Sequence, residues 1–407
     1  MPVRVEESVQ WRADSCCVDN FDLPIGGSPG RQMTGVEMAK TTSKRTDPAP
    51  AASAGRDVLA PGTRVAVTGA NGFIGSAITR ALVARRLDVV ALVEPGTRQT
   101  NLDGMPVERL EADVRDAEAM KQAIAGVRLV FHVAAVYRFW APDPASFYRV
   151  NVDGTRNVLE AARAAGCELV VYTSSVGTLG LEHVAERGPA DETCAPHVGH
   201  LFGLYKQSKY VAEHEVLRAA ALGMPVILAL PTTPLGPGDH TPTPTGRLVL
   251  DFLNGRMPGW FDTALNIVDV DDVAAGHLLA AERGGIGRSY IVGGENLELR
   301  EILAELARCT GLPRPRFRVP RPVAFGAAYL SELVEGRLLN RTPHVPLEGA
   351  RMASTRMVFS DARARRELGY RSRPAAEAIE RSARWFAENG YVTDKRCAAI
   401  HWRPATA

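Results

Sequence analysis

The stretch TGANGFIG, residues 68–75, holds three glycines in the spacing GxxGxxG. It follows the β-branched run RVAVT (64–68) and opens a segment, 76–86, with the composition of a helix. There the first glycine permits a tight turn, the second lets backbone N–H groups approach a pyrophosphate, and the third allows helix–strand packing. The positive helix end attracts the phosphate charge. The loop predicts a bound dinucleotide, contacted by Gly69, Asn71, Gly72, Phe73, Ile74 and Gly75.

Strand-like and helix-like runs alternate beyond this loop. Apolar runs that are typical of buried strands are separated by amphipathic helical segments. In chain order the main runs are DVVALV (88–93), LVFHVAA (129–135), TRNVLEAARAAG (155–166), ELVVYTSS (168–175), KYVAEHEVLRAAALG (209–223) and PVILALP (225–231). This order predicts an α/β fold, a doubly wound parallel sheet with helices on both faces.

The alternation also predicts the domain organisation. Residues 61–235 form the dinucleotide-binding domain, and 236–395 form a smaller, mostly substrate-binding region, with 265–293 returning to the main sheet. We interpret 1–60, rich in Ser, Pro, Ala and Gly, as a poorly ordered extension or an upstream start-site artefact, and 396–407 as a tail. A regulatory or targeting arm is the alternative for 1–60.

Composition excludes several classes of protein. A net charge of +2 over 407 residues favours no nucleic-acid partner, and no apolar run has the length of a membrane span. Six scattered cysteines without a zinc-like spacing indicate a reduced chain without a metal site. The N-terminus does not resemble a secretory signal, so we expect a cytoplasmic protein.

Acidic and small residues extend the predicted cofactor site. Glu94 stands nineteen residues after Gly75, where a carboxylate binds ribose hydroxyls and repels a 2′-phosphate. It favours NAD as the cofactor, although the nearby Arg98 keeps NADP as an alternative. Asp113 and Val114 follow another strand, where the carboxylate can reach the adenine amino group. Ala134 and Ala135 end a strand and leave room for the cofactor at the sheet edge.

A tyrosine and a lysine, Tyr205 and Lys209, form the pattern YxxxK within a helical run. Positions i and i+4 share one helix face, so we expect the lysine to lower the pKa of the tyrosine. The tyrosine can then exchange a proton with a substrate hydroxyl while hydride is transferred. Ser174 and Ser175 end a strand thirty residues earlier, at the sheet edge where ligands bind. Each motif alone also fits a structural role: a packed aromatic, a surface acid or a serine that satisfies the backbone.

Together, in this order, the motifs resemble the extended short-chain dehydrogenase/reductase superfamily, in particular the NAD-dependent epimerase/dehydratase family, over residues 62 to 389. The resemblance implies a catalytic triad of Ser175, Tyr205 and Lys209, with Ser174 the less favoured serine. It also implies cofactor contacts from Asn151 and Pro231. One departure is Asp269, which stands where histidine is common in the family and puts a substrate contact there in doubt.

Several runs are similar to the hopanoid-associated sugar epimerase subgroup, which itself resembles dihydroflavonol 4-reductases. They include YRFWAPDP (137–144), VVYTSSVGTLG (170–180) and TPTPTGRLVLDFLNGRMPG (241–259). The resemblance implies a sugar-like substrate or a sugar-bearing lipid. Relatives often carry arginine at the position where this chain has Glu94. The glutamate therefore puts in doubt the NADP preference that the resemblance would imply.

Substrate contacts are predicted less directly. Tyr137 follows the strand that ends at the predicted cofactor site and could line the substrate pocket. Arg247 could bind a phosphate or carboxylate of the substrate. For both, packing or plain surface exposure is the alternative. The arginine-rich, apolar run 319–341 could contact a membrane surface or simply cover a domain. A homodimer is also expected from the resemblance.

These observations predict an NAD(P)-dependent, epimerase-like oxidoreductase that acts on sugars or nucleotide sugars by reversible hydride transfer at a hydroxyl-bearing carbon. A dihydroflavonol-4-reductase-like ketone reductase is the alternative, because both reactions need the same triad. A non-catalytic NAD(H) scaffold or sensor is an alternative of another class.

Overall fold

The computed structural model describes residues 57–182, 184–197, 201–257, 259–338, 341, 347–353 and 355–403. Val58 and Leu59 are buried in the core, at 7% and 8% exposure. The predicted boundary at residue 61 is therefore slightly late, because these two apolar side chains already belong to the fold. The rest of the prediction for 1–60 lies outside the described residues.

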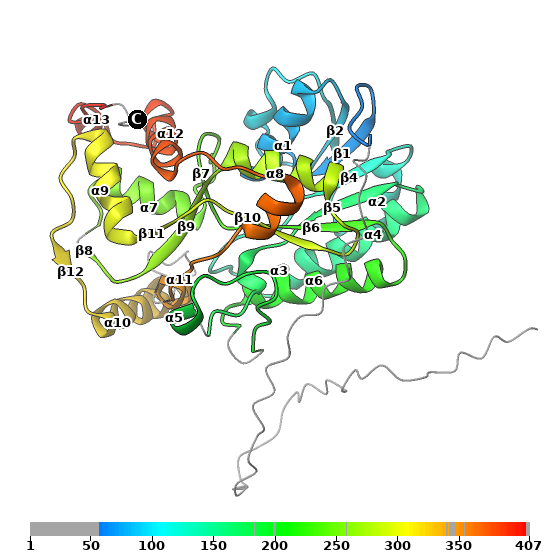
Figure 1. The fold of residues 1–407 in the computed structure, drawn as a ribbon. Helices are drawn as coiled ribbons and strands as arrows, with labels where there is room; N and C mark the ends of the chain where they lie inside the picture. Colours follow the sequence, from blue (N-terminus) through cyan, green and yellow to red (C-terminus); the bar gives the residue numbers. More distant parts are fainter. Residues whose placement is uncertain are drawn as a thin grey trace, which may run out of the picture. The chain divides into compact units, whose positions relative to one another are not determined.

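A parallel sheet of seven strands forms the centre of the fold (Figure 1). Its strands are β1 (Arg64–Thr68), β2 (Asp88–Val93), β3 (Glu108–Glu111), β4 (Leu129–His132), β5 (Leu169–Thr173), β6 (Val226–Pro231) and β10 (Ser289–Val292). Their spatial order is β10-β6-β5-β4-β1-β2-β3. Because the chain order reverses beside β1, the doubly wound sheet predicted from the sequence is confirmed.

Helices cover both faces of this sheet. They are α1 (Phe73–Ala84), α2 (Ala117–Ile124), α4 (Gly154–Ala164), α6 (Leu204–Ala221) and α8 (Val270–Arg283). Strand residues alternate between the faces, as the pleat requires: Val65 and Val67 pack with α1 and α8, whereas Ala66 packs with α2, α4 and α6. Burial on both faces explains the continuous apolar runs in the sequence.

A further hydrophobic cluster is built mainly from α7, α9 and α12, and the remaining elements lie outside the seven-stranded sheet. The strands here are β7 (Thr233–Leu235), β8 (Gly259–Trp260), β9 (Ala264–Asp269), β11 (Glu295–Glu298) and β12 (Phe317–Arg318). The helices are α3 (Ser146–Tyr148), α5 (Val184–Arg187), α7 (Pro244–Leu253), α9 (Leu299–Thr310), α10 (Arg321–Ser331), α11 (Leu347–Ala353), α12 (Ala375–Glu388) and α13 (Asp394–Cys397).

Two predicted boundaries need correction. Within 265–293, α8 and β10 do return to the main sheet, but β9 does not, because β7 and β11 occupy its two edges. The predicted tail also packs against the C-terminal cluster as far as residue 403. The backbone N–H of His401 donates to Thr310 O at 2.8 Å, and the Arg384 guanidinium lies 4.4 Å from the ring centroid of Trp402.

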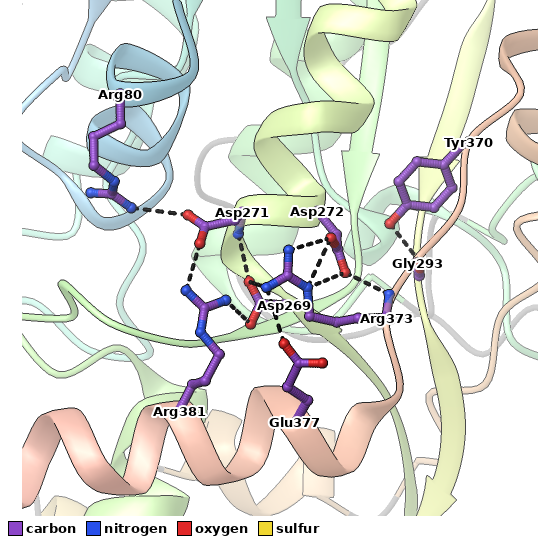
Figure 2. Close-up of polar contacts among 9 residues, drawn as sticks. All are labelled: Arg80, Asp269, Asp271, Asp272, Gly293, Tyr370, Arg373, Glu377 and Arg381. Atoms are coloured by element: carbon purple, nitrogen blue, oxygen red, sulfur yellow. Dashed lines mark hydrogen bonds and ion pairs between the residues drawn. The ribbon is translucent and has the colours of Figure 1, made fainter. Parts of the chain in front are cut away.

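A network of ion pairs joins the start of α8 to α1 and α12 (Figure 2). Asp269 is fully buried, accepts from the backbone N–H of Asp271 at 2.8 Å, and pairs with Arg381 of α12 at 2.5 Å. Asp271 pairs with Arg381 at 2.6 Å and with Arg80 of α1 at 3.1 Å. Asp269 therefore caps a helix and links three elements, and its carboxylate is directed to arginines.

The surface near α10 is unusually apolar. Val323, Tyr329 and Leu330 are 60%, 63% and 59% exposed, and they follow the exposed Arg314 and Arg316. Within the described residues, none of the helices combines the length and apolar character that a membrane crossing requires.

Candidate active site

The glycine-rich loop connects β1 to α1 and is too tightly packed for side chains at two of its glycines. Gly69 has φ +64°, and a Cβ there would lie 2.9 Å from Ala134 Cα. A Cβ on Gly75 would lie 2.1 Å from Gly69 O. The close approach of β1, β4 and the start of α1 therefore depends on glycine at both positions.

The start of α1 is suited to an anion. Its N-cap, Gly72, has no side chain to cap the helix, so the first backbone N–H groups face outward for a ligand. Phe73 and Ile74 are half-buried and pack against the core. Asn71 braces the loop through Nδ2, which donates to Thr97 Oγ1 and Arg98 O, each at 2.9 Å. This arrangement fits the pyrophosphate of a dinucleotide.

The predicted acids near the ribose and adenine lie together, bridged by an arginine that sequence reasoning missed. Arg115 Nε donates to both carboxylate oxygens of Asp113 at 2.9 Å, and its Nη2 lies 3.4 Å from Glu94 Oε1. The hydrogen bond from Arg115 lowers the pKa of Asp113, against the opposing effect of burial. Glu94 is exposed at the end of β2. Two carboxylates and one cation thus flank the predicted ribose position.

The other predicted cofactor residues lie along the same edge of the sheet. Val114 is buried, and a Cβ on Gly154 would lie 2.7 Å from its Cγ2. Ala134 is half-buried and Ala135 is exposed directly after β4, and Pro231 is buried at the end of β6. Asn151 is buried: its Oδ1 accepts from Val136 N at 2.8 Å and its Nδ2 donates to Ser208 Oγ at 2.9 Å. Asn151 therefore fixes the loop after β4 to the helix that carries Tyr205.

The two neighbouring serines have different surroundings. Ser174 is buried and donates its hydroxyl to Glu213 Oε2, which also accepts from Thr178 Oγ1 at 2.7 Å. Ser175 is half-buried, accepts from Gly177 N at 3.0 Å, and hydrogen-bonds the Tyr205 hydroxyl. Only Ser175 is thus brought together with the tyrosine, because Ser174 is directed to Glu213, about two turns further along α6.

Tyr205 and Lys209 lie one turn apart in α6, but their polar groups have different partners. The Lys209 Nζ donates to Tyr172 Oη at 2.9 Å and to Thr173 O at 2.7 Å. Burial lowers the pKa of Lys209 to about 7. Burial raises the pKa of Tyr205 to about 12, although its hydrogen bond with Ser175 opposes this rise.

The expectation that Lys209 lowers the pKa of Tyr205 is therefore wrong for the protein without its cofactor. The physical reason is twofold: burial weakens the positive charge of the amine, and the amine is directed to Tyr172 and Thr173. A nicotinamide, when bound, exchanges hydride with the substrate, and its positive oxidised form would favour the tyrosinate.

Tyr172 is a second residue that sequence reasoning missed, and it belongs to a buried polar chain. His132 Nδ1 and Nε2 lie 2.8 Å from Thr68 Oγ1 and 3.0 Å from Thr155 Oγ1, and Tyr172 hydrogen-bonds Thr155. Burial lowers the pKa of His132 to about 3, so the ring is neutral. This series of hydrogen bonds connects Lys209 to Thr68 at the end of β1. The run VVYTSS contained the signal for it, because its tyrosine is the penultimate residue of β5.

A cavity of about 340 Å³ lies beside the triad. A Cβ on its lining residue Gly177 would lie 3.3 Å from Ser175 Oγ, and Lys206, the neighbour of Tyr205, also lines it. Among the described residues its lining is Gly177, Leu179, Leu181, Glu182, Pro196, Leu201, Phe202, Lys206, Glu348, Arg351 and Thr355. Five of these residues have apolar side chains, and two carboxylates, two cations and one hydroxyl provide the polar groups.

Of the predicted substrate residues, Tyr137 lies beside Tyr205, whereas Arg247 lies outside the cavity lining. The Tyr137 ring lies 4.8 Å from the Tyr205 ring, centroid to centroid, so the loop after β4 does reach the triad. Arg247 is exposed on α7, donates to Pro242 O at 3.3 Å, and does not line the cavity. Asp269, which stands where histidine is common in the family, forms an ion pair with Arg381.

The arrangement can transfer a proton beside a bound dinucleotide. The Tyr205 hydroxyl can donate to or accept from a substrate oxygen, and Ser175 can hold that oxygen by a second hydrogen bond. Lys209 and its partners Tyr172 and Thr173 hold α6 against β5, which keeps the tyrosine at the strand ends.

Comparison with known proteins places this geometry in context. Residues 65–293 match the model of the NAD dependent epimerase/dehydratase family. The chain is 42% identical over 330 residues to a putative dihydroflavonol 4-reductase of Synechocystis sp., covering 80% of this chain and 95% of that one. It is 35% identical over 327 residues to sterol demethylase protein B of Methylococcus capsulatus, covering 80% and 99%.

Solved structures share the fold. The UDP-glucose 4-epimerase of Thermus thermophilus, solved in complex with NAD, is 26% identical and superimposes with a TM-score of 0.62. The match covers 81% of this chain and all of the epimerase chain.

Proposed function

Because the chain belongs to the NAD dependent epimerase/dehydratase family, we propose that it interconverts a hydroxyl and a ketone on a largely apolar small molecule, with NAD as the hydride carrier. It is an NAD-dependent enzyme of the extended short-chain dehydrogenase/reductase type. The proposal concerns the substrate class, the direction of the reaction and the residues that perform it.

The cavity beside Ser175 and Tyr205 is the observation that carries this proposal. Five of the eleven described residues that line it are leucine, proline or phenylalanine, so it offers apolar contacts to a substrate. The relatives named for dihydroflavonol reduction and sterol demethylation support an apolar polycyclic substrate. We therefore rank a reductase above the sugar epimerase that the sequence favours.

In the proposed reaction, Tyr205 donates its proton to the ketone oxygen during reduction and accepts it back during oxidation. Ser175 orients that oxygen, and Lys209 stabilises the tyrosinate after the proton has left. The buried surroundings keep water from competing for the same proton.

A direct experiment compares wild type with Tyr205→Phe. Apolar ketones and the matching alcohols are supplied with NADH or NAD, and turnover is followed by NADH absorbance. We expect a loss of about 10²–10⁴-fold in kcat, since the general acid–base group is removed. NAD binding and the melting temperature, measured in parallel, should be retained. Equal turnover by the two proteins would refute the mechanism.

A sugar epimerase is the second candidate, supported by the likeness to the Thermus thermophilus epimerase. An epimerase oxidises and then reduces the same carbon, so it should keep NAD through purification and consume no net NADH. A reductase should consume NADH in proportion to product. A role in hopanoid biosynthesis rests on the sequence resemblance alone and stays a proposal.

Two partner predictions also stay predictions. The peripheral membrane contact draws support from the exposed apolar face of α10 and the arginines before it. The homodimer rests on the family resemblance.

A further inference from the structure

The carboxyl group of Glu348, in α11, lies against the start of the helix that carries Tyr205. A Cβ placed on Gly203, the N-cap of α6, would lie 1.9 Å from Glu348 Cδ and 2.0 Å from Oε1. Gly203 has φ +87°, a conformation that favours glycine. The missing side chain at Gly203 thus makes room for an acid that is 143 positions away from Tyr205 in the sequence.

One oxygen of this carboxyl group has no partner. Glu348 Oε1 is buried and has no hydrogen-bond partner among the described residues. Buried polar atoms in native proteins are nearly always hydrogen-bonded, since an unsatisfied one costs free energy. An acid with an unsatisfied oxygen beside Tyr205 is therefore suited to a ligand that forms the missing hydrogen bond.

The charges around Glu348 show which form of the acid is present. Burial raises its pKa to about 8, assisted by Glu332, while Lys206 of α6 and Arg351 of α11 oppose the rise. The Tyr205 and Tyr137 hydroxyls face it as well. At neutral pH the group is mostly protonated, so it can both donate and accept a hydrogen bond.

Glu348 also lines the cavity beside the triad. It shares that wall with Gly177, next to Ser175, and with Lys206, next to Tyr205. A substrate that reaches the triad through this cavity therefore passes the carboxyl group of Glu348. The remaining wall combines five apolar side chains with Glu182, Lys206, Arg351 and Thr355.

We propose that Glu348 binds a second, unreactive oxygen of the substrate, a neutral hydroxyl, ether or carbonyl group, and thereby selects apolar substrates that carry one. This inference rests on the proposed function, because it assumes that the substrate occupies the cavity beside Tyr205. Glu348 acts on binding and takes no part in proton transfer.

Three bicyclic ketones test the proposal: 1-tetralone, 6-hydroxy-1-tetralone and 6-methoxy-1-tetralone. Their binding to the enzyme loaded with NAD⁺, in which no hydride can be transferred to a ketone, is measured by calorimetry. We expect wild type to bind the hydroxylated probe about tenfold more tightly than 1-tetralone, the value of one added hydrogen bond. Glu348→Leu should lose this preference, and Glu348→Gln should keep it within about threefold, since the amide also donates and accepts.

The methoxy probe adds a pH readout, because its oxygen only accepts hydrogen bonds. In wild type, the ratio of its affinity to that of 1-tetralone should fall as the pH passes about 8, where Glu348 loses its proton. In Glu348→Gln this ratio should stay constant. A purely structural role for Glu348 would not produce this difference.

Glu182→Gln is the matched control, because Glu182 lines the same cavity but already accepts from His197 N at 3.1 Å. It should keep the preference for the hydroxylated probe. A wild-type enzyme without that preference, or a preference that survives in Glu348→Leu, overturns the proposal. Turnover is scored separately: no hydride transfer to any probe, with the preference intact, would refute the proposed function and leave the role of Glu348 standing.

Discussion

Tyr205 shows how a single side chain depends on its surroundings. Its hydroxyl is buried, bonded to Ser175 and close to the acid Glu348, and its pKa is raised to about 12. Lys209, one turn away, has a pKa lowered to about 7 by the same burial. Both groups are thus biased toward their neutral forms, which keeps Tyr205 in the protonated form that ketone reduction requires.

The pH dependence of the reaction follows from this bias. Alcohol oxidation needs ionised Tyr205, so its kcat/KM should rise about tenfold per pH unit below the pKa of that residue. Ketone reduction needs the protonated form and should stay nearly level over the same range. Measuring both directions between about pH 6 and pH 9 checks the assignment. A level oxidation profile would contradict the role of Tyr205.

Glu94 provides a second prediction at the scale of one residue. Its carboxylate repels a 2′-phosphate and lies 3.4 Å from Arg115, which stays paired with Asp113 when the Glu94 carboxylate is removed. Glu94→Ala should therefore shift the ratio of NAD to NADP affinity toward NADP by about tenfold, a change of about 1.4 kcal/mol. Glu118→Ala removes an exposed acid paired with Lys121 in α2 and should leave the ratio unchanged. An unaltered ratio in Glu94→Ala would show that Glu94 does not discriminate.

At the scale of elements, the loop between β1 and α1 is held by contacts that admit no Cβ. Gly69 lies against Ala134 of the segment after β4, and Gly75 lies against Gly69 O. The helix start, the first strand and the neighbouring strand end are thus fixed within one tight turn. That fixes the direction of the α1 N-terminus toward the cofactor.

Gly75→Ala should therefore damage the cofactor site. The new Cβ would meet a backbone oxygen at 2.1 Å, so either the turn or the helix start must move. We expect NAD affinity to fall by at least about tenfold, with a lower melting temperature, because the N–H groups of α1 lose their alignment. Calorimetric titration and thermal melting measure both effects.

Gly326→Ala is a control for the glycine substitution itself. Gly326 lies inside α10 with nothing within 4 Å of its added Cβ, so alanine should stabilise that helix by up to about 1 kcal/mol. NAD affinity should not change. Similar losses in both variants would mean that the clash at Gly75 is not the cause.

At the scale of the whole described fold, the ion-pair network at the start of α8 joins segments that are far apart in the sequence (Figure 2). Arg373 donates its backbone N–H to Asp272 Oδ2 at 2.8 Å, and its side chain pairs with the same carboxylate at 3.0 Å. Asp269 is buried between Arg373 and Arg381. These contacts fix the C-terminal helix α12 to the dinucleotide-binding half.

Asp269→Ala should lower the free energy of unfolding by about 3 kcal/mol, because it removes the fully buried carboxylate that pairs with Arg381 and Arg373 and caps α8. Arg381 keeps its pair with Asp271. Asp88→Ala removes an exposed partner of Arg64, 2.7 Å away, and should cost less than about 1 kcal/mol. Urea unfolding of the two variants provides the comparison. An equal cost would show that burial of the Asp269 pair does not matter.

Local sequence determined the order of elements, the glycine loop and the pairing of Tyr205 with Lys209 on one helix. These features depend on periodicity and on spacings of a few residues, which are present in any short stretch of chain. The doubly wound sheet followed from the same alternation, and its strand order confirms it. The boundaries were less accurate, because Val58, Leu59 and the segment up to residue 403 pack through contacts with distant elements.

Tertiary structure alone decided which serine hydrogen-bonds Tyr205, which groups accept from Lys209 and which residues pair with Asp269. Ser174 is engaged by Glu213, 39 positions away, and Asp269 by Arg381, 112 positions away. Burial then reversed the expected shift in the pKa of Tyr205. The approach of Glu348 to the catalytic helix belongs to this class as well. Contacts between such distant positions, and the desolvation they cause, depend on how the elements pack, which no local spacing encodes.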